Sequence, residues 1–219
     1  MKSLSHRILL NFLFLLPLLC HAQEDQKPRT LFGGDQKVSH GGWGAPSAMY
    51  TRIMDTDALL VGGRAGWLIN HRVTIGLAGY GLTTALPNSK YDDHLQGLGD
   101  SLTRGSQFEM GYGGLLIEPI IAYRSPVHVS LPILIGVGGC GYQYSSRSPI
   151  EVDYANYRDL AQAFLVVEPG VDLEINVVPL VRLALGASYR YTSELDLPAT
   201  PKDALQGMNA SFTIKVGWF

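Results

Sequence analysis

Hydrophobic and polar residues alternate along most of this chain. In "VRLALGASYRY" (Val181–Tyr191) and "FTIKVGW" (Phe212–Trp218), every second residue is apolar, and the residues between are small, polar or charged. Successive side chains of a β-strand point to opposite faces, so a period of two predicts strands. No long segment after residue 37 shows the period of an amphipathic helix.

Eight segments of this kind are predicted, and the connections between them differ in length. The predicted strands are 41–54, 57–69, 72–85, 108–124, 127–144, 162–176, 179–192 and 207–219. Tight turns are expected at 70–71, 125–126 and 176–179, with longer polar loops at 86–107, 145–161 and 193–206. The connection at 55–57 is short, although it is expected at the same end as the long loops. An even strand number with short and long connections alternating is typical of an antiparallel up-and-down transmembrane β-barrel.

The composition favours a surface that is not covered by water. Charged residues make up 16 % of the chain and hydrophobic residues 46 %, whereas soluble domains carry about 25 % charge. The net charge of −2 gives no basic field for nucleic acid.

The first residues have the pattern of a secretory signal peptide. Lys2 and Arg7 precede the apolar run Ile8–Leu19, and "CHA" offers small residues before a cleavage site. We predict a signal peptide at 1–22, a polar tail at 23–38 and a β-barrel domain at 39–219. Acylation of Cys20 is the alternative, although the bulky Leu19 disfavours it. Without Cys20 only Cys140 remains, which excludes an internal disulfide.

The polar faces of the strands carry charges of both signs. If the apolar rows face lipid, these charges lie in the lumen and must pair with one another. The predicted lumen charge network consists of Glu118, Glu168, Asp172, Glu174, Arg64, Arg182, Arg190 and Lys215.

Aromatic residues gather near the predicted strand ends, which fits an interfacial girdle. They are Tyr123, Tyr142, Tyr144, Tyr189, Tyr191, Trp218 and Phe219. Cross-strand packing in a soluble, ligand-binding barrel is the alternative interpretation.

Two strands carry Glu-Pro at their centres, at 118–119 and 168–169. In a membrane barrel Glu118 and Glu168 take lumen positions, while Pro119 and Pro169 face lipid. Proline lacks the N–H that a ladder needs, so we expect a bulge or a sharp bend at both sites.

The last alternating strand ends with Trp218 and Phe219, which is similar to the C-terminal signal that the outer-membrane insertion machinery reads. Phe219 departs from that signal, because it does not lie on the apolar face that includes Trp218. With "GGRAGWLINHRVTIGLAGYG" and "EPGVDLEINVVPLVRLALGASYRYT", the chain resembles small outer-membrane barrels of Gram-negative bacteria with OmpA/OmpX-like architecture. The resemblance implies an outer-membrane location, membrane lipid and the insertion machinery as partners, and no catalytic residue.

Few residues suggest chemistry. His128 and Ser130 share a strand face and resemble the His-x-Ser of lipid A deacylases, with Glu118 or Glu168 to orient the histidine. However, the turn at Pro126 places His128 at the periplasmic rim, away from lipid A. Asp92, Asp93, His94 and Asp100 are expected to be solvated loop residues rather than metal ligands.

We therefore predict a structural, binding or adhesion protein without enzymatic activity or cofactor. An eight-stranded barrel is just wide enough for side chains, so no open pore is expected. Its extracellular loops would contact a protein partner that the sequence does not identify. A lipid-modifying hydrolase and a soluble ligand-binding barrel are the alternatives.

Overall fold

The computed structural model describes residues 38–99, 101–146 and 161–219, and residues Ser39–Phe219 form one compact unit. The predicted signal peptide and most of the predicted tail lie outside the described residues. The strands are β1 (His40–Ile53), β2 (Thr56–Ile69), β3 (Val73–Leu82), β4 (Leu86–Pro87), β5 (Leu102–Ile121), β6 (Val127–Ser130), β7 (Ile133–Ser146), β8 (Ala161–Val178), β9 (Val181–Thr192) and β10 (Gly207–Trp218).

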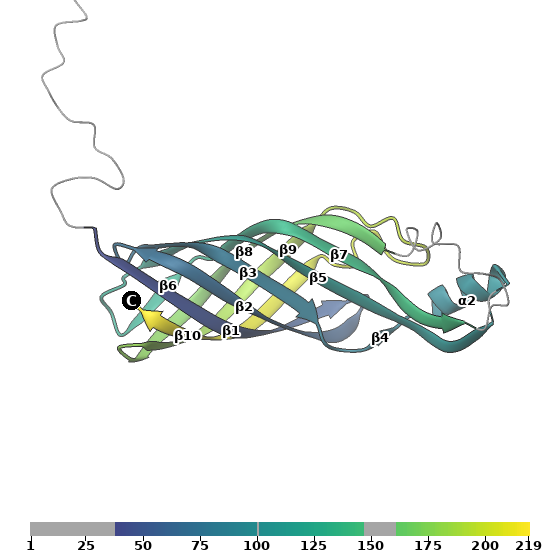
Figure 1. Cartoon of the computed structure of the whole chain (residues 1–219), viewed down its shortest axis with the longest axis horizontal. Coiled ribbons are helices and arrows are strands. Elements are labelled where there is room, and N and C mark those ends of the chain that lie inside the picture. Colours follow the sequence, from purple (N-terminus) through teal and green to yellow (C-terminus); the bar gives the residue numbers. More distant parts are fainter. Residues whose placement is uncertain (1–37, 100, 147–160) are drawn as a thin grey trace, which may run out of the picture. The chain divides into compact units, whose positions relative to one another are not determined.

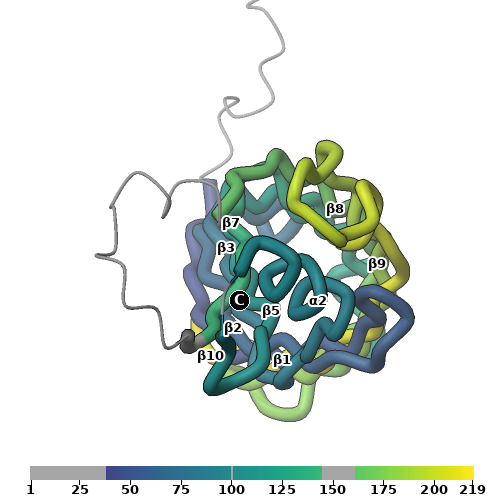
Figure 2. The backbone as a smooth tube through the Cα atoms, turned by 90° about the vertical axis from the view of Figure 1, so that its right-hand side faces the viewer, coloured from purple at the N-terminus to yellow at the C-terminus, as the bar shows by residue number. Residues whose placement is uncertain are grey.

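The strands close into an antiparallel ring (Figures 1 and 2). Neighbours pair in the order β1, β2, β3, β5, β7, β8, β9 and β10, and β10 returns to β1. β6 and β7 both lie between β5 and β8 and act as one interrupted strand, while the short β4 pairs only with β5. The structure thus confirms the predicted eight-stranded barrel.

The two ends of the barrel differ. Three tight turns, at residues 70–72, 122–126 and 179–180, lie at the end where β1 begins and β10 stops. We call this the short-turn end. The opposite, long-loop end carries the β1–β2 turn, the connection from β3 to β5, and residues 193–206 (Figure 1).

The outside of the ring is an apolar belt. Exposed side chains such as Leu77, Leu165 and Leu185 occupy its outward positions. Arg52, Asp57 and Glu109 border the belt at the long-loop end, and exposed Arg72 and Arg124 border it at the short-turn end. Between these borders, the outward positions of the described strands carry no Asp, Glu, Lys or Arg. An apolar surface of this extent indicates contact with lipid and disfavours the soluble alternative.

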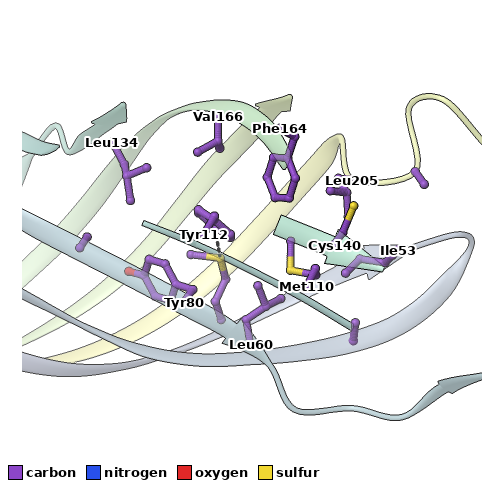
Figure 3. Close-up of a cluster of buried hydrophobic side chains, with 14 of the residues drawn as sticks. Ile53, Leu60, Tyr80, Met110, Tyr112, Leu134, Cys140, Phe164, Val166 and Leu205 are labelled. Carbon is purple, nitrogen blue, oxygen red and sulfur yellow. Dashed lines mark hydrogen bonds between the residues drawn. The ribbon is translucent and has the colours of Figure 1, made fainter. Parts of the chain in front are cut away.

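The interior has two unlike halves, which corrects the expectation of a polar lumen throughout. The half toward the long loops is a hydrophobic core (Figure 3) that includes Ile53, Leu60, Met110, Cys140, Phe164, Val166 and Leu205. A strand needs about 9–11 residues to cross a membrane, and β5 has 20. The parts of the strands that continue past the belt bury apolar side chains inward, as a soluble protein does.

A short helix was missed in the segment that the sequence assigned to a loop at 86–107. Helix α2 spans Ser89–Gly97, and the Asn88 side chain caps it by accepting from the backbone N–H groups of Lys90 and Tyr91 at 3.1 and 3.3 Å. Only Tyr91 and Leu95 of the helix are buried, a pattern too brief to stand out as a helical period. β5 also begins six residues earlier than the predicted 108. No described helix is long and apolar enough to span a membrane.

The two Glu-Pro sites lie within continuous strands. Pro119 in β5 and Pro169 in β8 flank the break between β6 and β7, at Leu131 and Pro132. At this level the Leu131 N–H donates to Pro119 O at 2.9 Å, and the Gly170 N–H donates to Pro132 O at 2.8 Å. The pairing of β5 and β8 with β6 and β7 resumes without a shift in register. At Pro119 and Pro169 the ladder therefore lacks a hydrogen bond, and no bulge is formed. The predicted bend of the two strands stays a prediction.

Placing a charge in the belt should destabilise the barrel in proportion to its depth. Leu185 is 60 % exposed near the middle of β9. We expect Leu185→Arg to lower the free energy of unfolding by about 2–4 kcal/mol, and Leu180→Arg, in the turn before β9, by about 0–1 kcal/mol. Urea unfolding in lipid vesicles measures both. Equal and small effects would contradict a lipid-facing belt.

Candidate functional site

The short-turn half of the lumen contains a buried group of charges centred on Lys215. Its ammonium donates to Glu118 Oε1 at 2.5 Å and to Glu174 Oε1 at 2.6 Å. It also lies 4.4 Å from the centre of the Trp43 ring, in cation–π geometry. Because β10, β5 and β8 supply Lys215, Glu118 and Glu174, this contact joins strands that do not neighbour one another in the ring.

Glu174 collects further partners from β6 and β9. Ser130 donates its hydroxyl to Glu174 Oε1 at 2.6 Å, while His128 Nε2 and Arg182 Nη1 lie 3.1 and 3.7 Å from Oε2. All of these side chains are buried. We call the six residues Glu118, His128, Ser130, Glu174, Arg182 and Lys215 the basal cluster.

A second ion pair lies nearer the middle of the barrel. Arg64 on β2 donates from Nη1 to Asp172 Oδ2 on β8 at 2.7 Å, and from Nε to Tyr80 Oη at 2.6 Å. Gly186 on β9 makes room for it, since a Cβ there would lie 2.1 Å from Asp172 Oδ1. Beside the pair, a cavity of about 20 Å³ is lined by Arg64, Asp172 and Glu168 among others. Such a space fits a single water molecule.

Glu168 and Arg190 do not form an ion pair with any described side chain. Glu168 accepts from the hydroxyls of Tyr112 at 2.5 Å and Ser188 at 2.6 Å. Arg190 donates from Nε to Leu205 O at 2.6 Å, and its guanidinium lies 5.6 Å from the centre of the Tyr112 ring. The eight predicted lumen charges are all buried, but they form separate groups rather than one network.

The strand register decides which charges meet. On β9, Arg182 lies opposite Asn176 of β8, and not opposite Asp172 or Glu174. Arg182 reaches Glu174 diagonally, and Asp172 instead pairs across the lumen with Arg64. Alternation predicts that a side chain points inward, but it does not predict the partner.

His128 and Ser130 lack the geometry of a hydrolase triad. In a triad the serine donates to the histidine, and the carboxylate orients the other ring nitrogen. Here Ser130 donates to Glu174, which also bonds His128 Nε2, and His128 Nδ1 has no hydrogen-bond partner among the described residues. The carboxylate beside His128 is Glu174, whereas the sequence analysis had proposed Glu118 or Glu168. Because all three side chains are buried, no substrate reaches them.

The long-loop end is covered by folded segments. Tyr91 of α2 stacks on Tyr142 of β7, with ring centres 3.9 Å apart. The Tyr142 hydroxyl accepts a hydrogen bond from Asn88 Nδ2 at 2.6 Å and shares another with Thr200 at 2.7 Å. From residues 193–206, the side chains of Leu195, Leu197, Ala204 and Leu205 are buried. We call residues 88–98 and 193–206 the cap; Figure 2 views the barrel from this end.

This arrangement corrects part of the predicted aromatic girdle. Tyr142 points inward beneath the cap and is not at the lipid surface. Trp218 and Tyr191 are exposed on the outside, at opposite ends of the belt, as a girdle requires. Phe219 follows the last strand, and its ring lies 3.8 Å from the Arg182 guanidinium. A role of Trp218 and Phe219 as an insertion signal stays a prediction.

One acidic residue of the predicted 86–107 loop has a structural role. Asp92 accepts a hydrogen bond from the Ser106 N–H at 2.7 Å, which ties α2 to β5. Asp100 lies outside the described residues. Among residues 38–99, 101–146 and 161–219, no group of three or more His, Cys, Asp or Glu side chains is placed to hold a metal ion.

Comparison with solved structures identifies the class of fold. No protein-family model and no curated protein matches the sequence. Neisserial surface protein A superposes with a TM-score of 0.53 at 13 % identity, covering 83 % of this chain and 99 % of that one. The N-terminal β-barrel domain of Pseudomonas aeruginosa OprF superposes with a TM-score of 0.46 at 11 % identity, covering 80 % of this chain and 97 % of that one. Yersinia pestis Ail superposes with a TM-score of 0.42 at 13 % identity, covering 82 % of this chain and 97 % of that one.

The chain therefore has the fold of a small outer-membrane β-barrel of Gram-negative bacteria. The outer-membrane location predicted from the sequence agrees with this fold and with the apolar belt. At these identities the comparison describes the fold, and the residues of this chain must carry the argument about function.

Removing Lys215 should destabilise the barrel, because Glu118 would lose its only described cation. We expect Lys215→Met to lower the free energy of unfolding by about 3–5 kcal/mol. Urea unfolding in vesicles, followed by heat-dependent gel mobility, measures the loss.

The matched control removes both charges. Glu118→Leu combined with Lys215→Met leaves no unpaired carboxylate at that position, since Glu174 retains Arg182, Ser130 and His128. The double variant should be more stable than Lys215→Met alone. A double variant whose loss equals the sum of the two single losses would contradict ion pairing as the cause.

Proposed function

We propose that this protein is an outer-membrane barrel of the binding or adhesion type, which holds its cap at the cell surface and transports no solute. Barrels of this kind have short turns in the periplasm and longer loops outside the cell. This orientation puts the short-turn end in the periplasm and the cap outside.

The filled interior is the observation that carries the proposal. The basal cluster occupies the short-turn half, and the hydrophobic core of Figure 3 occupies the other half. The cavity between them, about 20 Å³, fits one water molecule and no larger solute. A barrel closed in this way supports a role as a rigid support for its outer surface.

The cap has the features of a folded recognition surface. α2 is fixed from below by the Tyr91–Tyr142 stack and from the side by the Asp92–Ser106 bond. Residues 193–206 fold back on themselves, with the Leu195 N–H donating to Lys202 O at 2.9 Å, and they bury the side chains of Leu195 and Leu205. On the outside, Leu98 at the end of α2 is 71 % exposed. Apolar side chains that are exposed on a fixed element favour binding to a protein partner.

A lipid-modifying hydrolase built on His128 and Ser130 is a weaker proposal. The Ser130 hydroxyl donates to the Glu174 carboxylate and not to His128, and both Ser130 and His128 are buried at the end opposite the cap. A nucleophile of this type needs an adjacent base and access to substrate.

Replacing the cap helix should abolish adhesion without unfolding the barrel. We expect cells that display a variant with residues 89–98 replaced by a Gly-Ser linker to lose adhesion to immobilised host-surface proteins. The variant should still migrate as a folded, heat-modifiable barrel, because the basal cluster and belt are untouched. Cell adhesion assays and gel mobility measure the two properties.

Two controls sharpen this test. Leu165→Ser changes an exposed apolar side chain of the belt and should leave adhesion unchanged, whereas Leu98→Ser should weaken it. Wild-type protein in planar bilayers should give no stable single-channel conductance. Adhesion that survives loss of α2, or a stable conductance, would contradict the proposal.

A further inference from the structure

Basic and aromatic side chains meet at the short-turn end, where Arg72 and Arg124 are exposed and His71 and Tyr123 are half-buried. His71 and Arg72 come from the β2–β3 turn, and Tyr123 and Arg124 come from the β5–β6 turn. The two turns are adjacent because β3 pairs with β5, and the Ile120 N–H donates to Arg72 O at 2.6 Å. We call the four residues His71, Arg72, Tyr123 and Arg124 the rim cluster.

Tyr123 is the centre of the rim cluster. The guanidinium carbons of Arg72 and Arg124 lie 5.7 and 5.6 Å from the centre of its ring, within cation–π range. His71 stacks against the same ring, with centres 5.9 Å apart and planes 10° from parallel. Arg124 Nε donates to the Tyr123 hydroxyl at 3.2 Å, and this hydrogen bond lowers the pKa of that hydroxyl. Two cations are thus held close together.

No carboxylate of the described residues pairs with either arginine. At the opposite end, Arg52 lies 3.4 Å from Asp57, and Lys202 lies 3.2 Å from Glu194. Arg72 and Arg124 therefore differ from these surface cations in lacking an acidic partner within ion-pair distance. Two neighbouring positive charges that lack an acidic partner attract an anion from outside the chain.

The backbone of both turns is held in an uncommon conformation. His71 has a φ of 57°, and Ala122, which directly precedes Tyr123, has a φ of 57°. An alanine in the left-handed region costs about 1 kcal/mol or more. Backbone strain of this kind is common at functional segments.

The rim cluster borders the lipid-facing belt. Ile121, two residues before Tyr123, is 54 % exposed, and Val127 at the start of β6 is also exposed. Phospholipid phosphates lie just beyond the hydrocarbon region of a bilayer, at the level where tyrosine side chains gather. An arginine guanidinium matches the geometry of phosphate oxygens and can bind two of them at once.

We propose that the rim cluster binds the phosphate of a phospholipid headgroup in the periplasmic leaflet, and that it prefers an anionic lipid. In phosphatidylcholine a choline ammonium accompanies the phosphate, whereas phosphatidylglycerol has no cation of its own. The rim cluster supplies the missing positive charge. This site requires only that the short-turn end lies at a membrane surface, and it does not depend on what the cap binds.

Native mass spectrometry of the full chain, released from bilayers of phosphatidylcholine and phosphatidylglycerol in equal amounts, tests the proposal. Wild-type barrel should retain phosphatidylglycerol in preference to phosphatidylcholine. Arg72→Gln combined with Arg124→Gln should weaken phosphatidylglycerol binding by about tenfold or more, because two charge-assisted hydrogen-bond donors are lost. Both side chains are exposed in turns, so the variant should remain folded and heat-modifiable on gels.

The matched control is Arg52→Gln, which removes an exposed arginine that already has an acidic partner at the other end. It should leave the lipid preference unchanged. Retention of phosphatidylglycerol that is equal in wild type and the double variant would overturn the proposal. Displacement of the lipid by millimolar inorganic phosphate would also overturn it, since the site would then recognise phosphate without requiring a membrane lipid.

Discussion

The contact between Lys215 and the carboxylates of Glu118 and Glu174 is the constraint on which the rest of the barrel depends. These charges are fully enclosed, and they are tolerable only where the closed sheet brings them together. The pairing fixes β5, β8 and β10 across the lumen, and the outside is then free to be apolar. Buried ion pairs add little net stability compared with apolar residues, but removing one partner is costly. We therefore regard the basal cluster as a device that specifies closure and register.

The rim cluster, the basal cluster and the hydrophobic core follow one another along the barrel, from the short-turn end to the cap. The rim cluster lies at the short-turn end, next to the apolar belt, and the basal cluster fills the lumen behind it. The hydrophobic core of the long-loop half supports the cap through Phe108 and Tyr142, whose rings lie 5.3 Å apart. The outer surface of the cap lies beyond this filled lumen, and it is the surface that we propose contacts a partner.

The sequence predicted the strands well because a lipid-facing belt imposes a strict period of two. The predicted strand 207–219 is observed at Gly207–Trp218, and 57–69 at Thr56–Ile69. Other features depend on contacts that alternation does not encode. The Arg64–Asp172 pair joins residues 108 positions apart, and α2 is fixed by a tyrosine stack with β7. The apolar half of the lumen beneath the cap was not predicted, because alternation shows which side chains point inward but not how far the strands continue past the membrane.

The three tryptophans of the chain test the central claim that the barrel is apolar outside and carries its buried ion pairs in the short-turn half of the lumen. Trp67 and Trp218 are 52 % and 75 % exposed on the belt, whereas Trp43 is 5 % exposed and lies over Lys215 in the lumen. Single-tryptophan variants, with the other two changed to Phe, can be reconstituted in vesicles of brominated phosphatidylcholine. Bromine should strongly quench the fluorescence of Trp67 and Trp218 and spare Trp43. Strong quenching of Trp43, with Trp67 and Trp218 spared, would contradict this account.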